Sequence, residues 1–494
     1  MQKGWNMMKR NAYKWLGASV MAALTLMTSP AMAKGVEITL PGQAAETVQN
    51  ALEHPSKQVN FDNMLIAEKL PAAPEAPVEE TIQIDLRGAV STAIENNRDI
   101  RISEYALTQA EAAVSEAAAA KNPSLSYDFT ASRNRSEGTS TTGGKNVVTI
   151  QNRYSNGVNV SWPLWTGGRA EGLISAARYQ RSAAEEAVEL SEADTKLSAT
   201  SAYYQYLEAI NLEDVSRESV DNLTSHLTNV QQQYNAGIVA KLDVLSSNVS
   251  LANAKQAYIT AQNAKDVAEA NLNNIMRLPM STKLVPTDTN FPEPEFTITM
   301  DQALSIADKN RWEIRQAEYA YKAAKEQVKV AKSGYLPTIS VGGGYNWQDD
   351  DFPGFDNEGW SITGGLSWSL WDGGATDAQI KSAKAAMHSA EESLQQVRES
   401  VALEVRQDYL NILAAKEKIR ATEAAVAEAE EAYKIATVRY KSGVGINLDV
   451  LDAQYNLNSA RTNYITAMYD YNVGLATLEK ALGIPAVIRP DSDN

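Results

Sequence analysis

Few residues of this chain could carry out chemistry. The sequence of 494 residues contains no cysteine, which excludes a thiol nucleophile, a thiolate metal site and a disulfide framework. Its three histidines, His54, His226 and His388, lie far apart and share no helical or hairpin spacing. We therefore expect no histidine metal site or catalytic cluster, and so no enzyme. The formal net charge of −16 argues against a nucleic-acid partner, because phosphate binding needs a basic face.

Two glycine-rich segments imitate nucleotide-binding motifs without meeting their requirements. Segment 138–145 has one residue too many before its lysine and lies between two expected strands rather than before a helix. Segment 443–445 lacks a third glycine and joins two expected helices. The acidic loop 349–358 lacks the ligand spacing of a calcium site, so a solvated loop is the better interpretation. We expect neither a cofactor nor a metal.

The best candidates for a functional site are carboxylates beside two similar glycine turns. Asp243 follows the turn at Gly237, and Asp449 and Asp452 follow the turn at Gly443. The simplest interpretation is local, because a glycine at a helix end adopts positive φ whatever the function. An acid in the first turn of the next helix also favours the helix dipole by about 0.3–1 kcal/mol. A role for these carboxylates in function is the alternative.

The elements that position these residues occur twice along the chain, as an internal repeat. Residues 84–101 match residues 298–315 at a shift of 214, and from residue 162 onward the shift is 206. The change of shift predicts a longer connection between the strands of the first copy. The two copies span residues 81–290 and 291–494.

The N-terminal residues are typical of a cleavable signal peptide. Residues 1–33 combine early basic residues, an apolar run at 15–27 and an Ala-Met-Ala cleavage site at 31–33. A membrane anchor is the alternative, but the apolar run is shorter than the ~20 residues of a membrane span. Residues 34–80 follow as an extension that ends in a proline-rich linker. The signal peptide predicts an exported protein.

Each copy is expected to contain a very long helix and a shorter return helix. The segment between the glycine pair at 167–168 and Gly237 contains no proline and a single glycine, and residues 375–440 repeat it. About 68 residues at ~1.5 Å each give a rod near 100 Å. The expected return helices are 241–277 and 447–482. The expected helices near 98–121 and 312–333 could stack end-on with them along the long partner.

Between these helices, each copy contains two segments in which apolar residues recur at every second position, the period of a strand. We expect strands at about 124–131 and 154–165, and at about 338–347 and 360–371. Strands of ~9–11 residues can cross a bilayer, and tryptophans near their ends resemble the interfacial girdles of outer-membrane barrels. The girdle candidates are Trp162, Trp165, Trp347, Trp360, Trp368 and Trp371. A half-buried hairpin of a soluble protein is the alternative.

Four such strands cannot close a sheet in a membrane, because an open edge in lipid leaves backbone groups without hydrogen-bond partners. Several chains would have to combine their strands. Two chains would give eight strands and three would give twelve, and the residues alone do not choose between them.

Taken together, these features resemble the TolC family of outer-membrane efflux and secretion channels. The Trp-x-Leu-Trp-x-Gly-Gly strand exits at 162–168 and 368–374, and the Tyr-x-x-Gly turns at 234–237 and 440–443, carry a resemblance that covers about residues 82–486. It implies a mainly α-helical chain with membrane β-strands that assembles as a homotrimer. A twelve-stranded β-barrel in the outer membrane would continue into an α-helical barrel, a tunnel across the periplasm. The implied partners are outer-membrane lipid, a periplasmic adaptor (membrane fusion) protein and an inner-membrane pump of the ABC or RND type.

The resemblance assigns roles to the two turns. It places the family's gate carboxylates on Asp449 and Asp452, which in a trimer would form rings totalling six carboxylates that bind cations and bias permeation. Tyr440 and Asp243 match positions whose contacts help to hold the periplasmic entrance shut. The adaptor would dock on Gly237, Ile238, Val239, Gly443, Val444 and Gly445.

Gly445 departs from the family pattern, because the family channel has an arginine there. The ionic contact of that arginine cannot form, so we expect closure to be weaker or held differently. Asp452 has Ser246 as its counterpart in the first copy, so the repeat itself does not require an acid at that position.

The resulting hypothesis is the exit duct of a tripartite efflux or type I secretion system, gated at the helical tips. A structural tether that spans the periplasm and never conducts is the alternative from another class. The substrate is not encoded in these residues, because drug efflux and protein secretion share one duct architecture.

Overall fold

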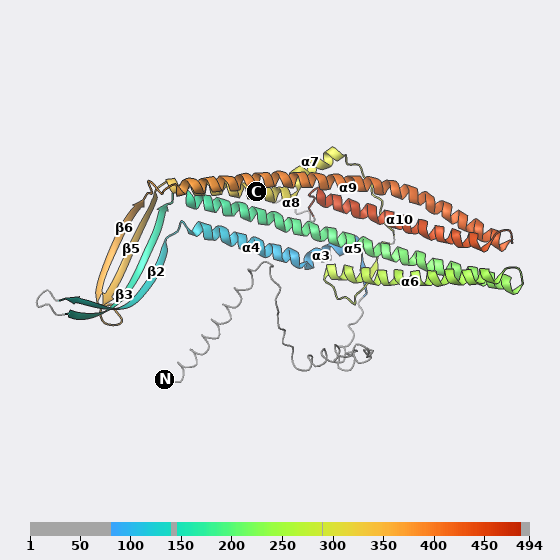
Figure 1. Cartoon of the computed structure of the whole chain (residues 1–494), viewed down its shortest axis with the longest axis horizontal. Helices are drawn as coiled ribbons and strands as arrows, with labels where there is room; N and C mark the ends of the chain where they lie inside the picture. Colours follow the sequence, from blue (N-terminus) through green and yellow to red (C-terminus); the bar gives the residue numbers. More distant parts are fainter. Residues whose placement is uncertain (1–80, 140–145, 289, 486–494) are drawn as a thin grey trace, which may run out of the picture. The chain divides into compact units, whose positions relative to one another are not determined.

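The computed structural model describes residues 81–139, 146–288 and 290–485 (Figure 1). The predicted signal peptide, residues 1–33, and the predicted extension and linker, residues 34–80, lie outside the described residues. Within these ranges, none of the helices has a stretch that is both long and apolar enough to cross a membrane.

Six main elements recur in the same order in both copies. The first copy contains α3 (Leu86–Asn96), α4 (Arg98–Ala119), β2 (Ser124–Thr139), β3 (Asn146–Trp165), α5 (Arg169–Asn235) and α6 (Lys241–Met276). The second contains α7 (Met300–Asn310), α8 (Trp312–Lys332), β5 (Thr338–Asp349), β6 (Asn357–Ser367), α9 (Ala375–Lys441) and α10 (Asn447–Ala481). Three short elements complete the described chain: β1 (Thr81–Ile84), β4 (Lys283–Pro286) and the 3₁₀ turn η3 (Ser333–Tyr335).

The two long helices are confirmed, and α5 and α9 each contain 67 residues. Each begins directly after a glycine in the left-handed region, Gly168 (φ 86°) or Gly374 (φ 91°), where a side chain would be strained. The shorter helices α4 and α6 both pack along α5, and α8 and α10 both pack along α9 (Figure 1). The long helices therefore connect the strands to the glycine turns without a break.

A close contact between α5 and α8 joins the two copies. Gly172, the only glycine in α5, lies where an added Cβ would come 2.7 Å from Val330 Cγ2 and 3.4 Å from the carbonyl oxygen of Glu326. A side chain at Gly172 would therefore push the two helices apart, which explains a glycine inside an otherwise favourable helical sequence.

The four long strands form one antiparallel sheet in the order β2-β3-β5-β6, with β3 and β5 joining the copies. The register places Tyr127, Val158, Tyr345 and Trp360 in one row across the sheet. The neighbouring row consists of Ser126, Asn159, Gly344 and Ser361. Since adjacent residues of a strand point to opposite faces, one face of the sheet is apolar and the other is polar.

Three of the predicted strand boundaries are wrong. β2 continues to Thr139 and β3 begins at Asn146, so the first hairpin extends well beyond the predicted 124–131 and 154–165. Its outer part carries polar residues on both faces, such as Ser132 and Arg133, so no alternating pattern marks it as strand. β6 runs from Asn357 to Ser367 and not to residue 371.

Two tryptophans explain how the strands meet the helices. The Trp162 indole Nε1 donates to the carbonyl oxygen of Lys121 (3.0 Å), just after α4. In the second copy, the Trp368 indole donates to the carbonyl oxygen of Tyr335 at the same distance. In both copies the indole ties the end of a strand back to the end of the preceding helix, and in the second copy β6 ends just before this contact.

A small parallel sheet of β1 and β4 was not predicted, because four-residue strands are too short to show a period. Glu269 of α6 accepts a hydrogen bond from the Leu284 backbone N–H (2.7 Å), and the Tyr206 hydroxyl donates to the Leu284 carbonyl oxygen (2.7 Å). These bonds hold β4 against α5 and α6, and the pairing of β1 with β4 attaches the start of the first copy there.

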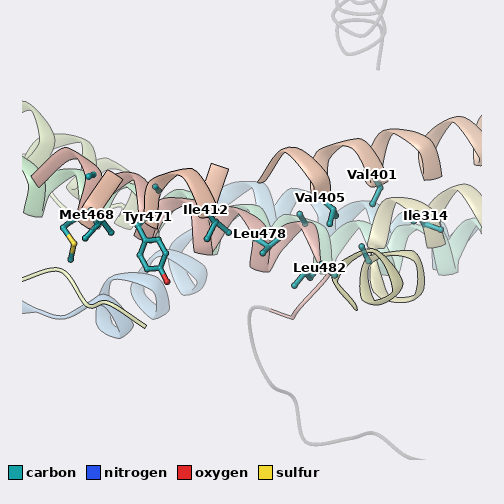
Figure 2. Close-up of a cluster of buried hydrophobic side chains, with 14 of the residues drawn as sticks. Ile314, Val401, Val405, Ile412, Met468, Tyr471, Leu478 and Leu482 are labelled. Carbon is teal, nitrogen blue, oxygen red and sulfur yellow. The ribbon is translucent and has the colours of Figure 1, made fainter. Parts of the chain in front are cut away.

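The core consists of narrow seams between helices. In the second copy it contains buried side chains of α8, α9 and α10, among them Ile314, Val405, Ile412 and Tyr471 (Figure 2). Alanines contribute much of the buried surface, so the helices approach closely. The Tyr471 hydroxyl donates to the carbonyl oxygen of Pro294 (2.6 Å), which attaches the linker between the copies to this seam.

Candidate functional site

The two glycine turns have the same geometry. Gly237 (φ 72°) follows α5 and Gly443 (φ 73°) follows α9, which confirms the predicted glycine ends of both helices. The Ile238 N–H donates to the carbonyl oxygen of Gln233 (2.9 Å), and the Val444 N–H donates to that of Arg439 (3.0 Å). Each turn thus uses glycine to satisfy the last carbonyls of a helix and to reverse the chain.

The turns present apolar side chains outward. Ile238 is 70% exposed and Val444 is 69% exposed. Gly237 and Gly443 are also exposed, whereas Val239 is half-buried against the helices of the tips. Each turn therefore ends in a small exposed apolar surface.

Gly445 is held against the end of α9. Its N–H donates to the carbonyl oxygen of Arg439 (3.1 Å), and an added Cβ would lie 3.0 Å from the backbone nitrogen of Tyr440. A larger residue would require the turn to shift by a few tenths of an ångström. The glycine at this position therefore allows a tighter turn than a long side chain would.

The two carboxylates of the second tip are exposed on α10. Asp449 lies in the first turn of α10, and Asp452 lies one turn further along. Within the described residues, neither side chain forms an ion pair or a hydrogen bond. Nor do the described residues contain a group of three or more metal-binding side chains arranged to hold an ion.

Tyr440 is buried between the two tips. It is 3% exposed and packs with Val230, Val244 and Val450. Burial raises the pKa of Tyr440 above its ordinary value, and the nearby charge of Asp243 raises it further. The hydroxyl has no hydrogen-bond partner within the described part of the chain. Asp243 is therefore near Tyr440, but the Tyr440 hydroxyl forms no hydrogen bond with it.

Asn447, which the sequence did not suggest, joins the two tips. It is the first residue of α10 and is 4% exposed. Its Nδ2 donates to the carbonyl oxygen of Asp243 (3.2 Å) and to Ser246 Oγ (3.0 Å). Its Oδ1 accepts from Ser247 Oγ (3.2 Å) and lies 2.6 Å from His226 Nε2. We call these five residues the tip network.

A helix-starting asparagine suggests a cap rather than a contact with another hairpin, which is why sequence reasoning missed Asn447. Here Ile446 precedes the helix and caps it with no side-chain bond, so the Asn447 amide is free to reach α5 and α6. His226 has no histidine partner in the sequence for a metal or catalytic site, so the sequence indicates no role for it. The residues around His226 on its helix are polar as often as apolar, so the sequence pattern does not indicate that His226 is buried.

The girdle candidates lie near both ends of the sheet. Trp347 and Trp360 lie near the β5–β6 connection, where Trp347 packs on Phe355 with ring centroids 5.9 Å apart. Trp162 and Trp165 lie at the other end, in the last residues of β3. Trp368 and Trp371 lie beyond the end of β6 rather than within it. Except for Trp347, which is half-buried, these indoles are exposed.

The match of the chain to a known protein family falls into two parts, which correspond to the two copies. A family model described as "Outer membrane efflux protein" matches residues 89–276 and 303–484, from α3 to the end of α6 and from α7 to just after α10. The chain is 27% identical to the outer membrane protein TolC of Escherichia coli over 304 residues, which cover 58% of this chain and 61% of TolC, less than two thirds of its length.

Two further comparisons cover more of the chain. It is 27% identical to the solvent efflux pump outer membrane protein SrpC of Pseudomonas putida over 410 residues, 80% of this chain and 84% of SrpC. A crystal structure of a membrane protein from Pseudomonas aeruginosa is similar with a TM-score of 0.71 and 23% identity, covering 81% of this chain and 90% of that one. This structural similarity shows a shared fold.

Proposed function

Because the chain belongs to the outer membrane efflux protein family, we propose that it forms the outer-membrane exit duct of a tripartite efflux or type I secretion system. The family places the protein in the outer membrane, and its relatives are outer-membrane proteins that include a component of a solvent efflux pump. In this role the chain passes substrates from an inner-membrane pump of the ABC or RND type, and it carries out no reaction itself.

The observation that carries this proposal is a sheet with one apolar and one polar face. Within the described residues, its outer strands β2 and β6 each pair on one side only. Strand directions alternate, so β6 of one chain and β2 of the next chain would again be antiparallel. In a homotrimer, twelve strands would join edge to edge, with the polar faces around a water-filled bore and the apolar faces against lipid.

The helices suit a passage through the periplasm. At ~1.5 Å per residue, the 67 residues of α5 or α9 extend for about 100 Å from the strands to the tips. The tips would then form the periplasmic entrance. There the exposed Ile238 and Val444 offer a docking surface to a periplasmic adaptor protein.

The gate is the set of tip residues that face one another across the entrance in the trimer. Asp449 and Asp452 are exposed and unpaired in the described chain, so three chains could bring six carboxylates together. Such a ring attracts cations and favours their passage. Tyr440 contributes through its packing with Val230 and Val244 of the first tip, and Asp243 through its backbone carbonyl, which accepts from Asn447.

A planar bilayer containing the purified trimer tests this proposal. We expect the wild-type channel to conduct with a preference for cations, measured as the reversal potential in a salt gradient. Neutralising both acids in the variant D449N/D452N should reduce that preference, because the ring of charge is lost. D470N is the matched control, because Asp470 lies on the same helix α10 but is paired with Lys418 (3.5 Å) away from the tip.

The result also separates the duct from a structural tether. A trimer that never conducts, with Asp449 and Asp452 either intact or neutralised, would favour the tether. Equal loss of cation preference in D470N and D449N/D452N would show that the tip acids are not the selective site.

A further inference from the structure

The orientation of the Asn447 amide follows from its partners. A backbone carbonyl can only accept a hydrogen bond, so the side of the amide that faces the Asp243 carbonyl must be Nδ2. Oδ1 therefore faces His226 and Ser247. Since Oδ1 can only accept, His226 donates from Nε2. Both donors and both acceptor positions of the Asn447 amide are thus used.

The tip network joins three helices of the two tips, and a ring contact links it to the fourth. Asn447 begins α10, His226 belongs to α5, and Ser246 and Ser247 belong to α6. The ring of Tyr440, from α9, lies against the His226 ring with centroids 5.0 Å apart. Asn447 thus bonds to both helices of the opposite hairpin, α5 and α6.

The network lies next to the carboxylates of the proposed gate. Asn447 precedes Asp449 by two residues on the same first turn of α10. The next polar contacts from α10 to α5 are more than two turns further along, where Asn458 Nδ2 donates to Ser219 Oγ (2.7 Å) and Arg461 pairs with Glu218 (2.6 Å). Asn447 is therefore the polar contact that fixes the outermost turn of α10.

We propose that Asn447 is the positioning residue that holds the α9–α10 tip against the α5–α6 tip and thereby sets the closed state of the entrance. This inference rests on the proposed duct function and adds how that same site is regulated. An opening movement that separates the two tips must break the bonds of Asn447 to Ser246, Ser247 and His226 together. Because His226 and Ser247 are buried and Ser246 is half-buried, each bond lost without a replacement disfavours the half-open state, which makes closure cooperative.

The variant N447A tests the proposal in planar bilayers. It removes every bond of the amide, so we expect the fraction of time that the channel is open to rise on the order of tenfold or more. S247A removes one hydroxyl from the network and should give a smaller rise in the same direction. N458A is the matched control, because it removes a bond between α10 and α5, the helices of the Asn447–His226 contact, but away from the tip; its open fraction should equal that of the wild type.

A double-mutant cycle separates positioning from general loosening of the helices. If Asn447 acts through His226, the open fraction of N447A/H226A should equal that of N447A alone rather than the product of the two single effects. The trimer content and thermal unfolding of each variant, measured by size-exclusion chromatography and circular dichroism, show whether it is folded. Should N447A fail to fold, a cycle of S247A and H226A tests whether the two partners of Asn447 Oδ1 are coupled through it.

The outcomes separate this inference from the proposed function. If D449N/D452N changes selectivity while N447A and N458A conduct like the wild type, the duct stands and the positioning role of Asn447 is wrong. If N447A and N458A open the channel equally, the tip network has no special role. If neither the wild type nor any variant conducts, the duct itself is wrong.

Discussion

The buried Tyr440 hydroxyl lies without a hydrogen-bond partner within the described residues, while its ring packs against Val230, Val244 and Val450. Removal of an unpaired buried hydroxyl is close to neutral, whereas removal of the ring leaves a cavity worth about 3–5 kcal/mol. We therefore expect Y440F to conduct and unfold like the wild type. Y440A should lower the thermal unfolding temperature and raise the open fraction. An open fraction raised equally by Y440F would instead mean that the hydroxyl holds the entrance.

His226 gives the tips a dependence on pH. Burial lowers its pKa below the ordinary value of 6.5; the bond to Asn447 acts in the opposite direction, and the charge of Lys441 again lowers it. Tyr440 and Lys441 on α9 and Asp243 on α6 are the titratable groups around this site. Closed tips thus bind fewer protons than separated tips in which the ring meets water.

Acidification should favour the open entrance. His226 favours closure above a pH of about 6.5, and this contribution is lost as the pH falls through its lowered pKa. We expect the open fraction in planar bilayers to rise on acidification, and H226Q to flatten that rise. A profile unchanged by H226Q would assign the acid response to other groups, such as the exposed carboxylates.

At the scale of elements, the contact between α5 and α8 can be tested at Gly172. Alanine favours a helix over glycine by about 1 kcal/mol, yet its Cβ would meet Val330 Cγ2 at 2.7 Å. Valine is stiff and cannot turn away freely, so we expect G172A to destabilise the protein by about 1–3 kcal/mol. The double variant G172A/V330A should recover part of that loss. Thermal unfolding checks this, and a more stable G172A would contradict the close contact.

Some of these elements could be predicted from the sequence and others could not. The long helices were predictable because glycine pairs mark their starts and single glycines mark their ends. The outer halves of β2 and β3 were not, because polar residues such as Ser132 and Arg133 occupy both faces. Of the site, the glycine turns could be predicted, whereas the contacts of Asn447 depend on how two hairpins from different copies meet.

For the whole molecule, neighbouring residues of β6 separate the two faces of the sheet. Ile362 points to the apolar face and Ser361 to the polar face. If the apolar face meets lipid, I362K costs about 2–4 kcal/mol near the middle of the bilayer and should greatly reduce the trimer recovered from the outer membrane. S361K should assemble normally and lower cation conductance. Equal recovery of both variants would show that the apolar face does not meet lipid.

The tips can be matched to a partner in cells. Because the chain has no cysteine, S442C introduces a single thiol on the exposed second turn. We expect a thiol-to-amine crosslinker to join S442C to a periplasmic adaptor protein, identified by mass spectrometry. S389C, in the sheet-proximal half of α9, is the control and should not capture the same protein. Capture at both positions, or at neither, would argue against docking at the tips.

The unequal strand lengths of the two hairpins have a consequence at the cell surface. β3 pairs with β5 only as far as Tyr154 and Asp349, so residues 132–139 and 146–153 pair with each other alone. In a threefold assembly, three β2–β3 hairpins would protrude from the rim of the barrel, separated by the three shorter β5–β6 hairpins. A phage or an antibody arriving from outside would therefore contact the protruding β2–β3 hairpins first. A solute leaving the duct could pass sideways above the shorter β5–β6 hairpins.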